Sequence, residues 1–100
     1  MSLLTKLFGK SDTDYKAMIA QGAKVVDVRT RQEFAGGHVP QSENIPLQDL
    51  EKKLAKMKSW NKPIVLCCAS GMRSGRAVSM MKSKGFEQVY NGGSWKNLVG

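Results

Sequence analysis

The sequence predicts an α/β fold in which a central parallel sheet carries helices on both faces. Short β-branched apolar runs alternate with segments of helical spacing, glycines separate many of these segments, and no internal repeat is present. Strands that alternate with helices form βαβ units, which have parallel strands and right-handed crossovers. A chain of 100 residues with this pattern makes one domain with a modest core.

The first half of the chain is predicted to form a helix, a strand, a helical turn and a short strand, at residues 15–20, 25–28, 30–34 and 44–47. The polar residues 11–14 supply a cap for the first helix, and Gly22 closes it. The pair Gly36-Gly37 breaks the helical turn. Pro46 restricts the second strand to an edge or to its own end.

The second half is predicted to form a helix, a strand, a helix, a strand and a short final helix, at residues 48–58, 64–67, 74–84, 88–90 and 94–98. Leu50 and Met57 lie on one face of the first of these helices. Ser74 is expected to cap the next helix, and Gly92-Gly93 are expected to form a turn.

Charge and hydropathy restrict the possible partners. The net charge is +8, but the sixteen basic residues form no block and do not alternate with aromatic residues. This pattern favours a solvated surface over nucleic-acid binding, although a positive field would still concentrate small anions. No apolar run approaches the roughly 20 residues that a membrane-spanning helix needs. The sequence predicts no oligomeric state.

Residues 1–11 are predicted to be an N-terminal arm and residues 12–100 a single domain. Lys6 interrupts the apolar part of the arm and no cleavage site follows, so a surface-packed helix is favoured over a secretory signal or a membrane-surface anchor. Two adjacent cysteines without a signal do not resemble a disulfide framework, which predicts a reducing cytoplasm. One histidine with two adjacent cysteines predicts no metal site.

The loop after the predicted strand 64–67 is the most informative segment for function. Cys68 stands where the apolar run ends, and the carboxyl end of a parallel strand faces the mouth of the sheet. The loop amides and the following helix N-terminus direct donors at the sulfur and favour its thiolate. Gly71 permits a tight turn, and Arg73 adds a positive charge. This arrangement predicts a nucleophilic Cys68 beside an anion held by backbone amides.

Other residues near this loop have competing interpretations. Cys67 continues the apolar run and is expected to be a small buried hydrophobic residue. Asp27 could be catalytic, but a strand-end aspartate that orders neighbouring loop amides is favoured. Arg29 and Glu33 are expected to form a structural pair. His38, the single histidine, suggests a Cys-His dyad, but a structural role in anchoring a turn is favoured.

Three motifs in this order resemble signatures of the rhodanese family, and together they cover residues 12–98. The first comprises Asp27-Val28-Arg29, Glu33-Phe34, Gly37-His38-Val39-Pro40 and Asn44-Ile45-Pro46-Leu47. The second comprises Cys68-Ala69-Ser70-Gly71-Met72-Arg73-Ser74, and the third Gly85-Phe86, Val89-Tyr90, Gly92-Gly93 and Trp95. The resemblance implies a three-layer fold with four to five parallel strands. The fifth strand depends on whether residues near Leu7 and Phe8 supply an opening strand.

The resemblance also implies a sulfurtransferase. Cys68 would take a sulfane sulfur from thiosulfate or a persulfide donor, and pass it to a thiol or to cyanide. The implied partners are a small anionic donor and a thiol or protein acceptor, and no cofactor is needed. The residues implied to bind substrate are those of the loop: Ala69, Ser70, Gly71, Met72, Arg73 and Ser74.

Two alternatives stay open at this point. Cysteine phosphatases and arsenate reductases of the related fold resemble Cys, five residues, Arg, and counting from Cys67 to Arg73 gives that spacing. Counting from Cys68 gives four intervening residues and places Gly71 and Ser74 as in rhodaneses. The shorter loop suits one sulfur atom and is tight for a tetrahedral oxyanion. The second alternative is a non-catalytic rhodanese-like binding module, against which the presence of Cys68 and Arg73 argues.

Overall fold

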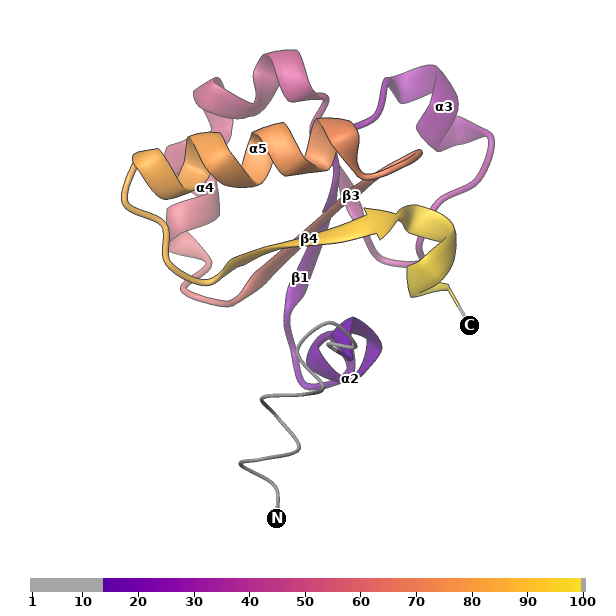
Figure 1. Ribbon diagram of the computed structural model, residues 1–100, viewed down its shortest axis with the longest axis horizontal. Helices are drawn as coiled ribbons and strands as arrows, with labels where there is room; N and C mark the ends of the chain where they lie inside the picture. Colours follow the sequence, from indigo (N-terminus) through magenta and orange to yellow (C-terminus); the bar gives the residue numbers. More distant parts are fainter. Residues whose placement is uncertain (1–13, 100) are drawn as a thin grey trace.

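The computed structural model describes residues 14–99 and shows a parallel sheet between two layers of helices (Figure 1). The strands, in the spatial order β2-β1-β3-β4, are β1 (Lys24–Asp27), β2 (Glu43–Asn44), β3 (Ile64–Cys68) and β4 (Val89–Ser94). The predicted α/β class is therefore confirmed, and the described chain has four strands. The arm predicted at residues 1–11, including Leu7 and Phe8, lies outside the described residues.

The helices are short except for one. They are α2 (Tyr15–Ala20), α3 (Arg31–Ala35), α4 (Leu54–Ser59) and α5 (Met72–Ser83), with the 3-10 helices η2 (Leu47–Lys53) and η3 (Trp95–Leu98). The single helix predicted over residues 48–58 is wrong in form, because the segment is η2 followed by α4. Asp14 caps α2, where its carboxylate accepts from the Ala17 amide at 3.0 Å.

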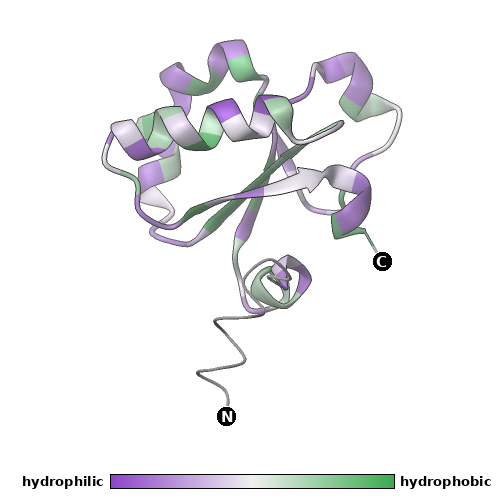
Figure 2. Ribbon diagram, viewed as in Figure 1, coloured by the Kyte–Doolittle hydropathy of each residue, from purple (hydrophilic) through white to green (hydrophobic). Residues whose placement is uncertain are grey.

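Alternate side chains of the central strands pack on opposite faces of the sheet, as strand geometry requires. Val26 and Leu66 pack with η2, α4 and α5 on one face. Val25 and Val65 pack with α2 and η3 on the other. Figure 2 shows the strands as the apolar centre of the molecule between more polar helices. Both central strands end at the same edge of the sheet, which places Asp27 beside Cys67.

The start of α5 differs from the sequence-based prediction. Gly71 precedes the helix in a left-handed conformation with φ of 101°, and the helix begins at Met72. The prediction that Ser74 caps this helix is wrong, because Ser74 lies in the first turn and is buried. A glycine at the turn lets the chain enter α5 directly from the loop, so that the serine hydroxyl points elsewhere.

The turn predicted at Gly92-Gly93 is also wrong, because both residues belong to β4. Leu66 pairs with Asn91, whereas Cys67 pairs with Gly93, so Gly92 is the extra residue of a β-bulge. A Cβ atom on Gly92 would lie 2.8 Å from a Val65 methyl carbon. The close approach of backbone to the core explains why glycine occupies this position.

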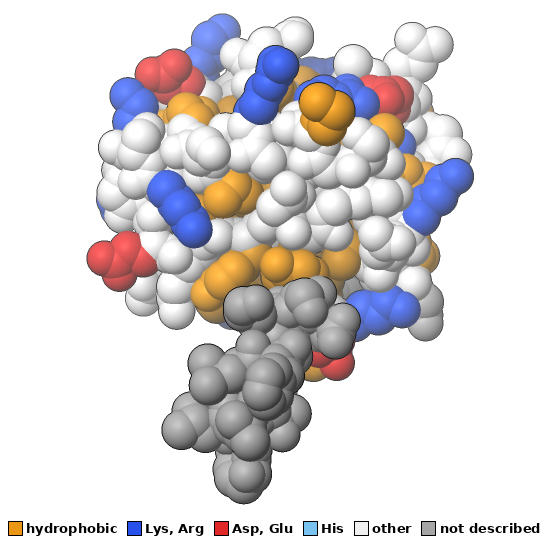
Figure 3. Space-filling model, in the orientation of Figure 1, with side chains coloured by type: hydrophobic (Ala, Val, Ile, Leu, Met, Phe, Trp, Pro, Cys, Tyr) orange, Lys and Arg blue, Asp and Glu red, His pale blue; other side chains and the backbone are white. Residues whose placement is uncertain are grey.

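The surface carries dispersed charge. Basic side chains are spread over the face shown in Figure 3 and do not gather into one patch. Among residues 14–99, no helix is both long enough and apolar enough to cross a membrane.

Candidate functional site

Cys68 ends β3 and lies beneath the loop that leads into α5. Its side chain is fully buried, and its sulfur accepts a hydrogen bond from the Gly71 amide at 2.9 Å. The Ser74 hydroxyl oxygen lies 3.5 Å from the same sulfur. In Figure 1 this loop lies at the end of the sheet that α3 and η3 also approach. The sequence-predicted nucleophile therefore sits among donors from the loop and the first turn of α5.

These donors change the acidity of the Cys68 thiol. Burial alone raises the pKa of a thiol, because it disfavours the charged form. Hydrogen bonds from the Ser74 hydroxyl and from the amides of Ser74, Gly71 and Ser70 outweigh burial and lower the pKa of Cys68 to about 7. About half of the Cys68 side chains are then thiolate near neutral pH, which is the nucleophilic form.

Cys67 lies on the opposite face of the sheet and has the opposite acidity. It is fully buried in the cluster that contains Val25, Val65 and Leu98. Burial and, next, the negative charge of Asp27 raise the pKa of Cys67 to about 12. This thiol stays protonated at neutral pH and packs as a small hydrophobic residue.

Arg73 is held by an acidic side chain rather than left open toward a ligand. Its guanidinium donates to both carboxylate oxygens of Glu33, at 2.8 and 3.0 Å. The hydrogen bond from Arg73 and, next, that from the Thr30 amide lower the pKa of Glu33 to about 2. The prediction that Arg29 and Glu33 form a pair is wrong for their side chains, because the Glu33 carboxylate binds Arg73.

Arg29 instead pairs with Asp27 in the interior. Its guanidinium donates to both Asp27 oxygens at 2.7 to 3.0 Å, and its backbone amide donates to Asp27 at 3.0 Å. The hydrogen bond that Arg29 donates to Asp27 raises the pKa of Arg29. Arg29 also donates to the Gly37 and Glu33 carbonyls and lies 4.8 Å from the centre of the Trp95 ring. This network fastens α3, and with it Glu33, to β1 and η3.

The remaining predicted site residues lie on the surface, either around the loop or just after α3. Ala69 and Ser70 are exposed, and 73% of the Met72 surface is accessible, which is unusual for a large apolar side chain. His38 is also exposed. Its ring stacks on Phe34 at 3.7 Å between centroids, and its Nδ1 lies 2.8 Å from the Phe34 carbonyl oxygen.

Asn91 is a site residue that the sequence-based prediction missed. Its amide NH2 donates to the Gly71 carbonyl at 3.0 Å. Its carbonyl oxygen accepts from the Ser74 hydroxyl at 2.6 Å and from the Gly93 amide at 2.9 Å. The available signal was a polar residue near the carboxyl end of an apolar strand, where parallel sheets place ligands and catalytic groups.

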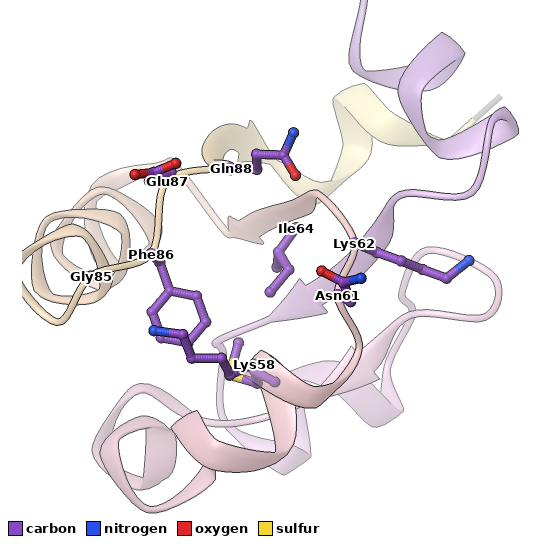
Figure 4. Close-up of a pocket in the computed structure, with 9 residues that line it drawn as sticks. Lys58, Asn61, Lys62, Ile64, Gly85, Phe86, Glu87 and Gln88 are labelled. Carbon is purple, nitrogen blue, oxygen red and sulfur yellow. The ribbon is translucent and has the colours of Figure 1, made fainter.

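A separate hollow of about 250 Å³ lies at the other end of β3, beside Ile64 (Figure 4). Phe86 and Lys58 form one wall, and the Lys58 ammonium lies 4.9 Å from the Phe86 ring centre. The lining contains neither cysteine nor any residue of the Cys68 loop. Within residues 14–99, no cluster of three or more His, Cys, Asp or Glu side chains could hold a metal ion.

Comparison with known proteins gives a consistent set of relatives. Protein YqhL of Bacillus subtilis is 38% identical over 69% of this chain, which spans about half (54%) of that protein. Thiosulfate sulfurtransferase GlpE of Pseudomonas savastanoi is 34% identical over 76% of the chain and 71% of its own length. Two other relatives, 35% and 28% identical, are named a putative sulfur carrier protein of Bacillus subtilis and a tRNA sulfurtransferase of Thermoplasma acidophilum, of which the chain spans 38% and 16%.

Solved structures show the same fold. A rhodanese from E. coli with bound anions superposes with a TM-score of 0.70 at 27% identity, covering 76% of this chain and 91% of that one. The human single-domain sulfurtransferase TSTD1 superposes with a TM-score of 0.68 at 29% identity, covering 83% and 87%. The sequence model of the rhodanese-like domain matches residues 11–98. The chain therefore belongs to the rhodanese-like domain family.

Proposed function

We propose that this domain is a sulfurtransferase that carries a sulfane sulfur on Cys68. The observation that carries the proposal is the position of the Cys68 sulfur, 2.9 Å from the Gly71 amide and 3.5 Å from the Ser74 hydroxyl, where these donors lower the pKa of the thiol. A low thiol pKa inside a set of backbone donors is the environment that nucleophilic cysteines need. The thiosulfate sulfurtransferases among the relatives support the same chemistry.

Thiosulfate or a persulfide is the proposed donor. The Cys68 thiolate attacks the outer sulfur of thiosulfate, a new S–S bond forms, and the S–S bond of the donor breaks. Sulfite leaves with the electron pair of the broken bond. An acceptor thiolate or cyanide then attacks the outer sulfur of the Cys68 persulfide and releases Cys68 as a thiolate. The Cys68 persulfide forms in the first displacement and is consumed in the second. Because each step exchanges one S–S bond for a new bond to sulfur, the transfer needs no cofactor.

The loop supplies the binding groups in this proposal. The amides of residues 69–74 stabilise negative charge on the transferred sulfur without reorganisation of solvent. Because the Cys68 side chain is fully covered, the proposed path of the donor to the sulfur runs past the exposed residues Ala69, Ser70 and Met72. Arg73 braces the loop through Glu33. The net charge of +8 favours a small anionic donor, and a reducing cytoplasm would keep the thiol free.

The phosphatase or arsenate reductase alternative requires Cys67 as the nucleophile. Its side chain lies on the other face of β3, among apolar residues, and burial raises its pKa to about 12. Such a thiol provides almost no nucleophile at neutral pH. The geometry therefore favours sulfur transfer through Cys68 over oxyanion chemistry through Cys67.

Intact-mass measurement after incubation with thiosulfate tests the proposal. The unmodified protein should gain one sulfur atom, Cys68→Ser should gain none, and Cys67→Ser should still gain one. Turnover with cyanide or a thiol acceptor should follow the same order. Equal loss in both folded variants, or phosphatase activity that depends on Cys67, contradicts the proposal.

A further inference from the structure

Asn91 joins the bulged strand β4 to the loop that surrounds Cys68. The side chain spans two points of the opposite segment, because it contacts both the Gly71 carbonyl and the Ser74 hydroxyl. These two residues also supply donors to the Cys68 sulfur, from the Gly71 amide and the Ser74 hydroxyl. A single side chain on β4 thus holds two of the residues that donate to the sulfur.

Only one orientation of the Asn91 amide satisfies these neighbours. The Gly93 amide can only donate, so it must face the carbonyl oxygen of Asn91, at 2.9 Å. The Gly71 carbonyl can only accept, so it must face the NH2 group, at 3.0 Å. The side chain is therefore fixed by a donor on its own strand and an acceptor on the loop.

The Ser74 hydroxyl has two possible acceptors but only one proton. It lies 2.6 Å from the carbonyl oxygen of Asn91 and 3.5 Å from the sulfur of Cys68. The shorter contact shows that the hydroxyl donates to the Asn91 carbonyl oxygen while Cys68 is a neutral thiol. When the sulfur is ionised it is the stronger acceptor, and the hydroxyl can rotate toward it. Asn91 then keeps the hydrogen bond from Gly93, so no polar group is left unpaired.

We propose that Asn91 is a positioning residue for the Cys68 nucleophile. It accepts a hydrogen bond from the Ser74 hydroxyl when the sulfur is neutral, and it lets that hydroxyl turn and donate its hydrogen bond to the sulfur when the thiolate forms. At the same time it holds the Gly71 turn, so the amide of Gly71 stays directed at the sulfur. The consequence for turnover rests on the proposed sulfur transfer, whereas the effect on the thiol itself does not.

The ionisable groups near the sulfur come from three elements. Arg73 at the start of α5 carries a positive charge close enough to interact with Cys68, and Glu33 on α3 pairs with it. Cys67 is the neighbouring thiol on β3. From β4, Asn91 and Gly93 face the loop and do not titrate. A pH profile of Cys68 therefore reports on Asn91 as long as Arg73 and Glu33 are unchanged.

The Asn91→Asp variant tests this proposal, with Asn61→Asp as the matched control. Asn61 is exposed at the other end of the sheet, so its substitution makes the same change in net charge far from the loop. The aspartate cannot donate to the Gly71 carbonyl. Its negative charge strengthens the hydrogen bond that it accepts from the Ser74 hydroxyl, and it disfavours a second negative charge on the Cys68 sulfur. The midpoint of the pH profile of Cys68 alkylation by iodoacetamide should rise in Asn91→Asp only. Each unit of rise slows alkylation below the midpoint by about tenfold, while the limiting rates at high pH converge.

A second measurement uses the unmodified protein and does not depend on the folding of that variant. The side-chain NH2 resonances of Asn91 should shift with pH at the same midpoint as Cys68 alkylation, and Ser74→Ala should abolish the shift. The proposal is overturned if the Asn91 resonances do not shift with the ionisation of Cys68. It is also overturned if the pH profiles of Cys68 alkylation are the same in Asn91→Asp and Asn61→Asp. Neither readout requires sulfur transfer, so a failure to form a persulfide would overturn the proposed function alone.

Discussion

Cys67 and Cys68 are neighbours in one strand, are both fully buried, and have opposite chemistry. Their pKa values, about 12 and about 7, differ by roughly five units. Burial raises the pKa of both thiols and is the largest cause of the high value of Cys67, so the low value of Cys68 requires the hydrogen-bond donors around its sulfur. The comparison shows that the face of the sheet on which a thiol lies decides which groups surround its sulfur and, through them, its acidity.

The two faces of the sheet place different chemical groups next to the cysteine sulfur. On the Cys67 side the neighbours are apolar residues and the carboxylate of Asp27, which both disfavour a thiolate. On the Cys68 side the hydroxyl of Ser74 and the amide of Gly71 donate to the sulfur. A thiolate can exist in a buried place when donors replace the water that it has lost.

The largest expected effect is a difference in alkylation between the two thiols. At pH 8 iodoacetamide should modify Cys68 at least about a thousandfold faster than Cys67, because the thiolate fraction differs by several powers of ten. The rate for Cys68 should rise with pH through about 7 and then level, since its thiol has that pKa. Mass spectrometry of peptides after partial modification assigns the site.

The Cys68→Ser variant provides the control for that measurement. It should remain unmodified at pH 8 while folded and react only after denaturation, which exposes Cys67. Rapid modification of Cys67 in the folded variant would contradict the distinction between the two sides of the strand.

The sequence predicted the position of Cys68 at the end of a strand and beneath a loop because the required signals are local. An apolar run that ends at Cys68, followed by small residues, a glycine and an arginine, specifies a strand, a tight turn and a helix. The partners of this loop could not be predicted in the same way. Glu33 precedes Arg73 by 40 residues, and Asn91 follows Ser74 by 17 residues. Such contacts depend on strand order and register, which a single sequence does not specify.

The two wrong local predictions at the site have a common physical cause. Ser74 is a good helix-capping residue, but the left-handed turn at Gly71 starts α5 earlier and turns the serine toward Asn91. Gly92-Gly93 is a typical turn signal, but here Gly92 is required by close packing against Val65 in a bulge. Tertiary contacts overrode local preference at both places, and both places adjoin the site.

Gly71→Ala tests whether the left-handed turn at Gly71 maintains the difference in pKa between Cys67 and Cys68. Gly71 has φ of 101°, and an added Cβ would lie 3.3 Å from the Gly93 Cα. The strain should cost about 1–2 kcal/mol of unfolding free energy, measured by urea denaturation. It should also displace the Gly71 amide from the sulfur and raise the alkylation midpoint of Cys68.

Gly85→Ala is the matched control for that variant. Gly85 has a similar φ of 95° at the far end of α5, where an added Cβ would meet only the flexible end of Lys58. We expect a comparable loss of stability without any change in the Cys68 midpoint. A shift of equal size in both variants would mean that global destabilisation, rather than the turn, controls the thiol.

The smallest effect is expected for Glu33→Gln, which removes the charge that binds Arg73. Both side chains are more than a third exposed, so the pair should contribute about 1 kcal/mol or less to stability. Glutamine can still accept from the Thr30 amide, so the capping box of α3 is largely kept. Glu51→Gln is a suitable control, because it removes the same charge from a more exposed ion pair, the one that Glu51 forms with Lys84.

The stability lost in Glu33→Gln should depend on pH, and the pKa of Glu33 gives the direction of that dependence. The pKa of Glu33 is lowered from 4.5 to about 2 in the folded protein, so its contribution is complete above pH 4.5 and disappears as the pH falls toward 2. Urea midpoints of the wild type and Glu33→Gln should therefore differ at pH 7 and converge in acid. The alkylation midpoint of Cys68 should stay near pH 7, because donors from Ser74 and the loop amides set it. A rise of a unit or more would show instead that the brace between Glu33 and Arg73 holds those donors in place.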